Sequence, residues 1–160
     1  MKPVPEKPFD PLSITARTGS GYPAPFDELV SGREKRALGN AVGLKNFGVN
    51  LVVLHPESAS SQRHHHSKQD EFIYVLSGEI TLCTDDGKQN IKAGECIGFP
   101  SATGNGHHLI NESDSIATYI EIGDRTPGDQ ADYPDIDLVA KSENGRYKFY
   151  HKDGKPYPEK

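Results

Sequence analysis

The chain has 160 residues, of which 34% are hydrophobic and 26% are charged, and this is typical of a single globular domain. The net charge is −5 and no block of Lys or Arg occurs, which argues against nucleic-acid or anionic-membrane binding. No apolar run is long enough to span a bilayer, and the N-terminus lacks the apolar core of a signal peptide.

Residues 1–44 are irregular in composition and rich in proline. The prolines among the first 25 positions are Pro3, Pro5, Pro8, Pro11, Pro23 and Pro25. Proline fixes φ and has no amide hydrogen, so such a stretch favours extended structure over a helix. We expect an extended N-terminal arm over residues 1–44, with one short helical turn within GREKRALGNAVGL.

From residue 45 the pattern changes to short strands and tight turns. The expected strands are FGVNLVVL, RHHH, EFIYVL, EITLCT, QNIKA, GECIGF, GHHLINE and IATYIEIG. An Asp-Gly step at residues 86–87 suits a tight hairpin turn. This spacing predicts an antiparallel sandwich or barrel over residues 45–123. Residues 124–160 form a polar extension with an aromatic-rich end, which we expect to pack on the barrel.

Three consecutive histidines, His64 to His66, stand just before a run of strand-forming residues. In a strand, residues i and i+2 point to the same face and lie roughly 6.6 Å apart. His64 and His66 therefore face one way and His65 the other. Two imidazoles so placed can converge on one ion, with ring nitrogens about 2.0–2.1 Å from zinc. Taken alone, solvated surface histidines are the simpler interpretation of this stretch.

Two further segments complete a candidate metal site. Glu71 follows His66 by five residues, and the turn-like stretch SKQD between them allows Glu71 to open the next strand and face the same cavity. In GHHLIN, alternation places His107 on the face of Asn111 and His108 on the other face. If this strand pairs beside RHHH, the site has three imidazoles and one carboxylate. We expect Asn111 to be a structural hydrogen-bonding residue.

The donor set indicates which ions fit. Imidazole suits Zn, Fe, Ni and Cu, and the carboxylate also admits Mn. We predict one divalent transition metal per chain, with zinc, iron or nickel favoured and manganese also compatible. Its expected ligands are His64, His66, Glu71 and His107. Glu71 is at the same time a candidate catalytic base, and the sequence leaves these two roles open.

These residues and their spacing resemble the two sequence motifs of the cupin superfamily. The first motif of that family has counterparts here in His64, His66, Glu71 and Gly78. The second motif has counterparts in Gly94, Pro100, Gly104, His107 and Asn111. Ser58 replaces the leading glycine of the first motif. In the second motif two extra residues separate the proline from the glycine, so the choice between His107 and His108 stays open.

The resemblance covers roughly residues 45–123 and implies an all-β fold. It implies an antiparallel double-stranded β-helix, or cupin jelly-roll barrel, with extended N- and C-terminal arms. The flanking stretches resemble a bacterial branch of small single-domain cupins, some of which are described as sugar-phosphate isomerases, a label that rests on fold analogy.

A metal site in such a barrel favours an enzyme acting on a small oxygenated molecule, as an isomerase or a dioxygenase. The alternative is a sensor that binds a small molecule without turnover. A sensor normally needs a partner domain, and the chain contains no helix-turn-helix segment, which favours the enzyme.

A sugar-phosphate isomerase also needs cationic groups near the ion. Arg63, Lys68 and Lys92 are close in sequence, but strand parity turns Arg63 away from the cavity and Lys68 lies in the expected turn. We therefore expect all three to be solvated surface charges. Tyr119 and Glu121 share one face of IATYIEIG, and we favour a packing or surface role for both.

The outer face of the expected strand EFIYVL is apolar. Phe72, Tyr74 and Leu76 point away from the expected cavity, and so apolar a face must be covered by the N-terminal arm or a second subunit. We predict a homodimer, which the cupin resemblance also implies.

Cys83 and Cys96 make no disulfide framework. Without an export signal, we expect reduced thiols in a cytoplasmic protein.

Overall fold

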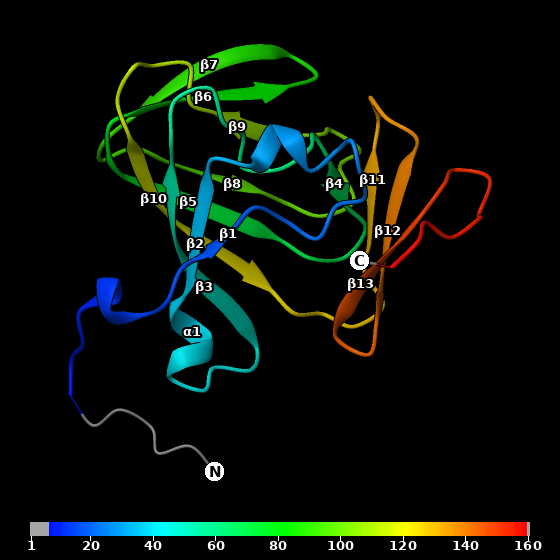
Figure 1. Ribbon diagram of the computed structural model, residues 1–160, viewed down its shortest axis with the longest axis horizontal. Coiled ribbons are helices and arrows are strands. Elements are labelled where there is room, and N and C mark those ends of the chain that lie inside the picture. Colours follow the sequence, from blue (N-terminus) through cyan, green and yellow to red (C-terminus); the bar gives the residue numbers. More distant parts are fainter. Residues whose placement is uncertain (1–6, 160) are drawn as a thin grey trace.

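The structure is a computed structural model that describes residues 7–159, so the first six residues of the expected N-terminal arm lie outside the described range. Within that range, antiparallel strands dominate (Figure 1). This confirms the all-β class and the jelly-roll barrel. No helix among the described residues is long and apolar enough to cross a membrane.

The largest sheet has six strands and brings together segments that are far apart in the sequence. In spatial order they are β1 (Arg17–Thr18), β2 (Arg33–Ala37), β3 (Phe47–Leu54), β10 (Ala117–Asp124), β5 (Glu71–Ser77) and β8 (Cys96–Phe99). Each strand runs antiparallel to its neighbours. β10 therefore lies between β3 and β5, and its inward side chains reach the centre of the barrel.

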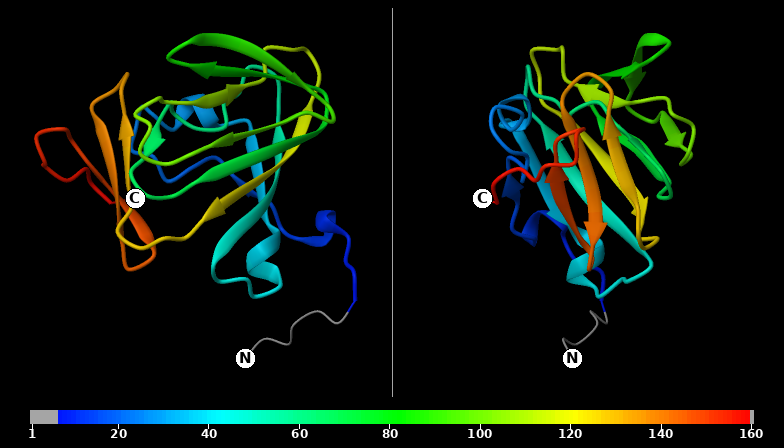
Figure 2. Two further views of the ribbon diagram at one scale, coloured as in Figure 1. Left: turned by 180° about the vertical axis from the view of Figure 1, so that it is seen from behind. Right: turned by 90° about the vertical axis from the view of Figure 1, so that its right-hand side faces the viewer.

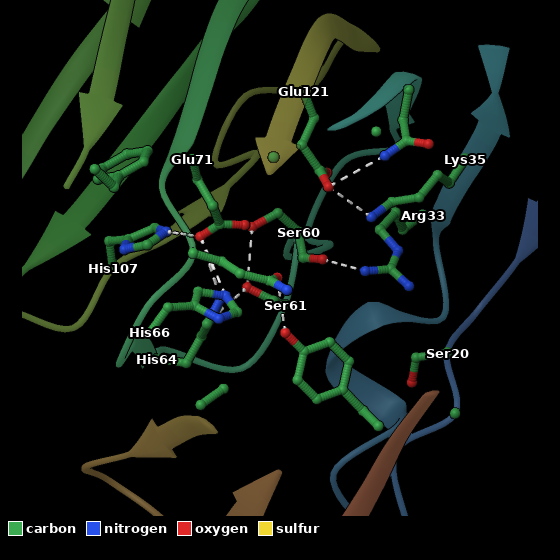
Figure 3. A pocket seen from close by; sticks show the side chains of 18 of the residues that line it. Ser20, Arg33, Lys35, Ser60, Ser61, His64, His66, Glu71, His107 and Glu121 are labelled. Carbon is green, nitrogen blue, oxygen red and sulfur yellow. Dashed lines mark hydrogen bonds and ion pairs between the residues drawn. The ribbon is translucent and has the colours of Figure 1, made fainter. Parts of the chain in front are cut away.

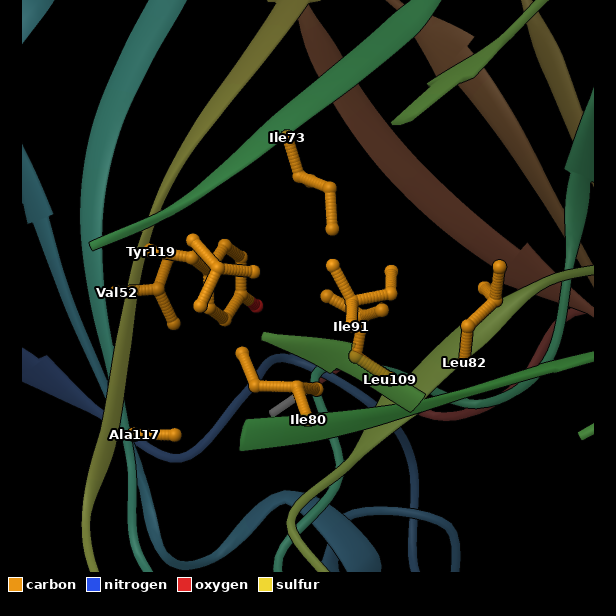
Figure 4. Packing of buried hydrophobic residues seen from close by; sticks show 9 residues of the cluster. Val52, Ile73, Ile80, Leu82, Ile91, Leu109, Ala117 and Tyr119 are labelled. Atoms are coloured by element: carbon orange, nitrogen blue, oxygen red, sulfur yellow. The ribbon is translucent and has the colours of Figure 1, made fainter. Parts of the chain in front are cut away.

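A three-stranded sheet closes the other side of the barrel. It consists of β7 (Gly87–Lys92), β6 (Glu79–Thr84) and β9 (His108–Ile110). The core between the two sheets is apolar and is shown in Figure 4. It contains Val52, Ile73, Val75, Ile80, Leu82, Ile91, Leu109, Ala117 and Tyr119. These residues alternate with outward-facing ones along their strands, which is the period-two pattern of a sheet with one buried face.

Residues after the barrel build a third sheet that lies beside it (Figure 2). Its strands are β13 (Arg146–Tyr150), β12 (Leu138–Glu143), β11 (Gln130–Tyr133) and β4 (His65–His66). A second apolar cluster joins this sheet to the N-terminal segment. It contains Tyr22, Val30, Ala131, Tyr133, Leu138 and Ala140. Residues 22–30 and the C-terminal sheet therefore pack on each other beside the barrel.

The N-terminal region contains more regular structure than the sequence suggested. Short helical turns occur in η1 (Pro11–Ser13), η2 (Glu28–Val30) and α1 (Leu38–Ala41), the last within the expected stretch. Arg33–Ala37, within the expected extended arm, forms strand β2, which pairs with β3 from Arg33 opposite Leu54 to Ala37 opposite Asn50. The segment REKRA has almost no apolar residues, so it lacks the alternation by which strands are recognised.

The connection between β5 and β6 depends on a glycine. Gly78 has φ of +77°, a region that L-residues other than glycine rarely adopt. A Cβ atom there would also lie 2.9 Å from Ala117 Cα and 2.9 Å from the carbonyl oxygen of Ile116. The glycine is therefore required both by its conformation and by the close approach of the neighbouring backbone.

Candidate metal centre

Backbone pairing brings two of the candidate ligands together. The amide of His64 donates to the carbonyl of His107 over 3.1 Å, and the amide of His107 donates back to the carbonyl of His64 over 2.8 Å. This is the pairing expected between RHHH and GHHLIN. Both side chains are 8% exposed. Their ring centroids lie 4.9 Å apart.

The other two candidate ligands approach from the neighbouring segment. His66 ends β4, and Glu71 opens β5 after the short connection SKQD, as the sequence predicted. Glu71 Oε2 lies 2.8 Å from His107 Nε2, and 3.5 Å from the Nε2 atoms of both His64 and His66. The donor atoms of His64, His66 and Glu71 all lie within 4.8 Å of one another. The carboxylate therefore lies at the centre of three imidazoles.

The buried surroundings and the mutual charges determine the protonation of this group. Burial alone would raise the pKa of Glu71, but hydrogen bonds with His107 and His64 and the nearby imidazoles hold it well below its usual value. Burial acts to lower the pKa of His64, yet the Glu71 carboxylate raises it overall. For His107, burial prevails and the pKa is lowered. Glu71 is therefore an anion at neutral pH.

The hydrogen bonds of the outer ring nitrogens show that the donor set fits a cation. His64 Nδ1 lies 2.8 Å from the carbonyl oxygen of Gln62, and His66 Nδ1 lies 2.6 Å from Asp129 Oδ2. Both partners can only accept, so each Nδ1 carries a proton and each neutral ring has an unprotonated Nε2. The two Nε2 atoms lie 3.1 Å apart. When both rings are neutral, their Nε2 lone pairs face each other over this distance, and such an arrangement is suited to a bound cation.

The neighbouring ring and backbone favour His107 over His108 as the fourth donor. The ring of Phe99 stacks on His107 with centroids 3.7 Å apart and planes 2° from parallel. His108, by contrast, lies opposite Cys83 of β6, and its Nδ1 lies 3.0 Å from the carbonyl oxygen of Ser61. His107 lines the cavity and His108 does not.

The donor set opens into a cavity of about 700 Å³ (Figure 3). The imidazoles and Glu71 occupy one side, and Arg33, Lys35 and Glu121 lie across the pocket from them. The basic side chains that line it are Arg17, Arg33, Lys35, Arg125 and Arg146. A small molecule that contacts the donor set is therefore close to several basic side chains, although Glu71, Glu121 and Asp124 also line the cavity.

Four of these basic side chains differ in how far their charge is already neutralised by a carboxylate partner. Lys35 Nζ forms an ion pair with Glu121 over 2.9 Å. Arg33 is only 9% exposed; it donates to the carbonyl oxygens of Ser60 and Gly19, and its Nε has no partner. A buried guanidinium without a carboxylate partner is costly, which makes this end of the cavity suited to an anion. Arg17 and Arg146 also lack a carboxylate partner within residues 7–159.

The interpretation of Glu121 needs correction, and that of Tyr119 needs an addition. Glu121 was expected at a packing or surface position, but it lines the cavity, where Lys35 and the amide of Asn50 donate to its Oε1. Tyr119 is a packing residue, as favoured, but it also lines the cavity and is 1% exposed. Both point inward because β10 is a central strand whose alternate residues face the barrel interior.

The other expectations for neighbouring polar residues hold with one exception: Arg63 is not a solvated surface charge, because its side chain is only 17% exposed and is paired with Asp85 and Asp135. Arg63 points away from the cavity and binds Asp135 through Nε and Nη2, over 2.7 and 2.8 Å. Neither Lys68 nor Lys92 lines the cavity. The side chain of Asn111 is fully buried and donates to the carbonyl oxygens of Leu54 and Ser115, which is a structural role.

Sequence reasoning missed the basic residues of the cavity and Asp129. Arg33 and Lys35 are two residues apart, a spacing that could have indicated one face of a strand if REKRA had been recognised as one. Arg17, Arg146 and Asp129 lie in segments with no motif around them. Only the packing of the N- and C-terminal regions beside the barrel brings them to the site.

Comparison with known proteins agrees with this architecture. A family model described as a cupin domain matches residues 50–123. A cupin-superfamily sugar phosphate isomerase from Silicibacter pomeroyi is 41% identical, over 95% of this chain and 97% of that one, with a TM-score of 0.90. A candidate sugar phosphate isomerase from Acidithiobacillus ferrooxidans is 29% identical, over 80% and 81% of the two chains, with a TM-score of 0.70.

A more distant structure shares the fold alone. It is a polyketide cyclase from Streptomyces resistomycificus, 18% identical over 87% of this chain and 89% of that one, with a TM-score of 0.64. No curated protein matches the chain. The fold, the paired histidine segments and the similarity along nearly the whole length lead to one conclusion: the chain belongs to the cupin superfamily.

Proposed function

We propose that this protein is a metal-dependent isomerase that interconverts the aldose and ketose forms of a phosphorylated sugar. The observation that carries the proposal is a single cavity that contains both the His64, His66, Glu71 and His107 donor set and several basic side chains without carboxylate partners. The similarity to a structure described as a sugar phosphate isomerase supports the same reaction class.

One divalent transition metal, with zinc, iron or nickel favoured and manganese compatible, would be held by these four residues. When bound, such an ion polarises a carbonyl oxygen as a Lewis acid. Glu71 is the anionic member of the set and offsets the charge of the ion. Its contacts with the imidazoles leave it as a ligand more readily than as a base.

We assign proton transfer to Glu121. Isomerisation removes a proton from the carbon beside the carbonyl and returns it to the former carbonyl carbon, so one carboxylate can perform both transfers. Glu121 is the second glutamate of the cavity, and both of its contacts, from Lys35 and Asn50, involve Oε1. Its Oε2 therefore remains available to a bound sugar.

The phosphate of the substrate would contact the basic side chains. Arg17 and Arg146 are exposed, come from opposite ends of the chain and line the same cavity. Guanidinium groups bind phosphate oxygens through paired N–H donors. An unphosphorylated sugar lacks the charge that these residues recognise, so we expect a strong preference for the phosphorylated form.

A panel of pentose and hexose phosphates and the free sugars, tested with zinc-, iron-, nickel- and manganese-loaded protein, checks the proposal. Proton NMR in deuterium oxide should show interconversion of a phosphorylated sugar, with deuterium incorporated at the transferred position. Glu121→Gln should abolish turnover but retain metal. His66→Ala should lose metal, whereas His65→Ala should keep it, because His65 does not line the cavity.

Three other outcomes would contradict the proposed isomerase activity or its preference for a phosphorylated sugar. Ligand-induced thermal shifts without product, under every metal, would indicate a sensor. Oxygen consumption with a keto acid or a catechol by the iron-loaded protein would indicate a dioxygenase. Equal turnover of free and phosphorylated sugars would contradict the role of Arg17 and Arg146.

We also propose that the protein acts as a cytoplasmic homodimer. The outward side chains of Phe72, Tyr74 and Leu76 on β5 are 39%, 43% and 48% exposed, so this strand presents an apolar face. Such a face is suited to association with a second copy. Cys83 and Cys96 are free thiols, which is consistent with a reducing compartment.

A further inference from the structure

Asp129 lies behind the metal centre, in the connection that leads into β11. Its side chain is 1% exposed, and it belongs to the C-terminal region, beyond the segment matched by the cupin-domain model. A buried carboxylate is costly unless its oxygens are hydrogen-bonded. The hydrogen-bond donors around the Asp129 carboxylate therefore indicate its role.

Five donors converge on this one carboxylate. Oδ1 accepts hydrogen bonds from the amides of Lys68 and Gln69, over 2.8 and 3.2 Å, and from the hydroxyl of Ser67 over 3.2 Å. Oδ2 lies 2.6 Å from His66 Nδ1 and accepts from the Tyr147 hydroxyl over 2.7 Å. One oxygen therefore holds the connection between β4 and β5, and the other holds a ring of the donor set.

The bond to His66 determines which ring nitrogen is protonated. The oxygens of Asp129 accept from two backbone amides and two hydroxyls, so this carboxylate also acts as the acceptor toward His66 Nδ1. In its neutral form, His66 then carries its proton on Nδ1 and presents an unprotonated Nε2 to His64 and Glu71.

We propose that Asp129 is a positioning residue that fixes the Nδ1–H tautomer and the ring orientation of His66, so that Nε2 is available to the metal. The role rests on the proposed metal site. Outer carboxylates that accept from a ligating histidine orient the ring and raise its basicity. Here that carboxylate is supplied by the C-terminal region, which therefore takes part in metal binding as well as in lining the cavity.

Tyr147 connects this arrangement to the C-terminal hairpin. It lies on β13, its hydroxyl approaches both Asp129 Oδ2 and Gln69 Oε1, and its ring centroid lies 6.3 Å from that of His66. It also lines the cavity. Tyr147 stabilises the Asp129 carboxylate, but it does not set the tautomer, because it contacts no nitrogen of His66 in the described hydrogen bonds.

Asp129→Asn is the decisive variant. The amide oxygen would turn to the three donors around Lys68, and the amide NH₂ would then face His66 Nδ1 and donate to it. The proton of His66 would move to Nε2, where it blocks coordination. We expect zinc affinity, measured by competition with a chelator, to fall by about 10–100-fold.

Two matched variants separate this effect from general loosening. Ser67→Ala removes a donor from the opposite carboxylate oxygen, and Tyr147→Phe removes a donor from the same oxygen without affecting the tautomer. Each should lower zinc affinity by about five-fold or less, as for one hydrogen bond. A loss in Ser67→Ala as large as in Asp129→Asn would overturn the proposal, and so would unchanged affinity in Asp129→Asn.

A second measurement uses the wild-type protein and does not depend on folding of the variants. Long-range proton–nitrogen NMR spectra at about pH 8, where free imidazole is neutral, report the tautomer of each histidine with and without zinc. His66 should carry its proton on Nδ1 in both states. A proton on Nε2 in the metal-free protein would refute the role of Asp129. If no divalent metal binds at all, the metal site fails, while the metal-free spectrum still decides the tautomer.

Discussion

The ring of Phe99 lies parallel to the ring of His107, 3.7 Å away centroid to centroid, and covers one face of it. Phe99 ends β8, the outer strand of the six-stranded sheet, and pairs with Glu71 across the strands. The same residue thus lies beside two candidate ligands. Unlike His64 and His66, His107 is oriented by an aromatic stack, and its outer nitrogen forms no hydrogen bond with the residues that the structure describes.

Phe99→Ala should therefore weaken metal binding through His107. The stack contributes about 0.5–1.5 kcal/mol beyond the apolar area that it buries. Its loss frees the ring to rotate, and zinc affinity measured by chelator competition should fall by about two- to ten-fold. Phe72→Ala, at an exposed position on the same sheet, is the control and should leave affinity unchanged.

Gly78→Ala should be strongly destabilising, because it combines a positive φ with a collision against Ala117 and Ile116. We expect the free energy of unfolding to fall by about 3 kcal/mol, measured by urea denaturation. Gly43 has the same φ of +77°, but nothing lies within 4 Å of the place that a Cβ atom would take, so Gly43→Ala should cost only about 1 kcal/mol. Equal losses in the two variants would show that conformation, and not the contact with Ala117, accounts for the glycine.

The pair of Arg63 and Asp135 should make stability depend on pH. Hydrogen bonds from Arg63 lower the pKa of Asp135 below its ordinary value of 3.8. A carboxyl group whose pKa is lowered by folding stabilises the fold above its unfolded pKa, and this stabilisation is lost as the pH falls through the folded pKa. Asp135→Asn should therefore lower the free energy of unfolding by about 0.5–1 kcal/mol at pH 7.

That difference should vanish well below the ordinary carboxyl pKa of about 4. Urea denaturation of both proteins at neutral and acidic pH measures it. Asp114→Asn is the control, since the Asp114 side chain contacts only the neighbouring Ser115 hydroxyl among the described hydrogen bonds. A loss in Asp135→Asn that persists undiminished in acid would exclude the ion pair as its cause.

Association should depend on the outer face of β5. Leu76→Asp places a charge on the exposed apolar face of Phe72, Tyr74 and Leu76, and desolvating that charge opposes association. Light scattering should give twice the chain mass of 17.5 kDa for the wild type and a shift toward the single-chain mass for Leu76→Asp. Leu12→Asp, at a 63% exposed position on η1, should remain dimeric. A monomeric wild type at micromolar concentration would rule out the dimer.

The barrel and the proximity of His64, His66, Glu71 and His107 could be predicted from the sequence because both follow from local alternation. His64 and His66 share a face by strand parity, and Glu71 opens the next strand after a recognisable turn. The pairing of His64 with His107 needed only two neighbouring strands. Alternation within a strand fixes which side chains share a face, and this holds however the strand packs in the fold.

The remainder of the site could not be predicted, since it depends on how distant segments pack. Arg33 and Lys35 lie on a charged strand that is recognisable only through its pairing with β3. Asp129 reaches His66 because β11 pairs with β4, so that Ala131 lies opposite His66. The contact spans 63 residues, and no spacing within one element indicates it.

The two functional parts of the cavity come from different segments of the chain, so substitutions can alter them separately. The donor group lies within residues 64–107, whereas the basic residues that face it come from residues 17–35 and 125–146. Substitutions in the two flanks can therefore alter which molecule is accepted while the ion and its reactivity stay the same. A chimera that carries this barrel with the flanks of a relative should inherit the relative's choice of substrate, provided that Asp129 is kept.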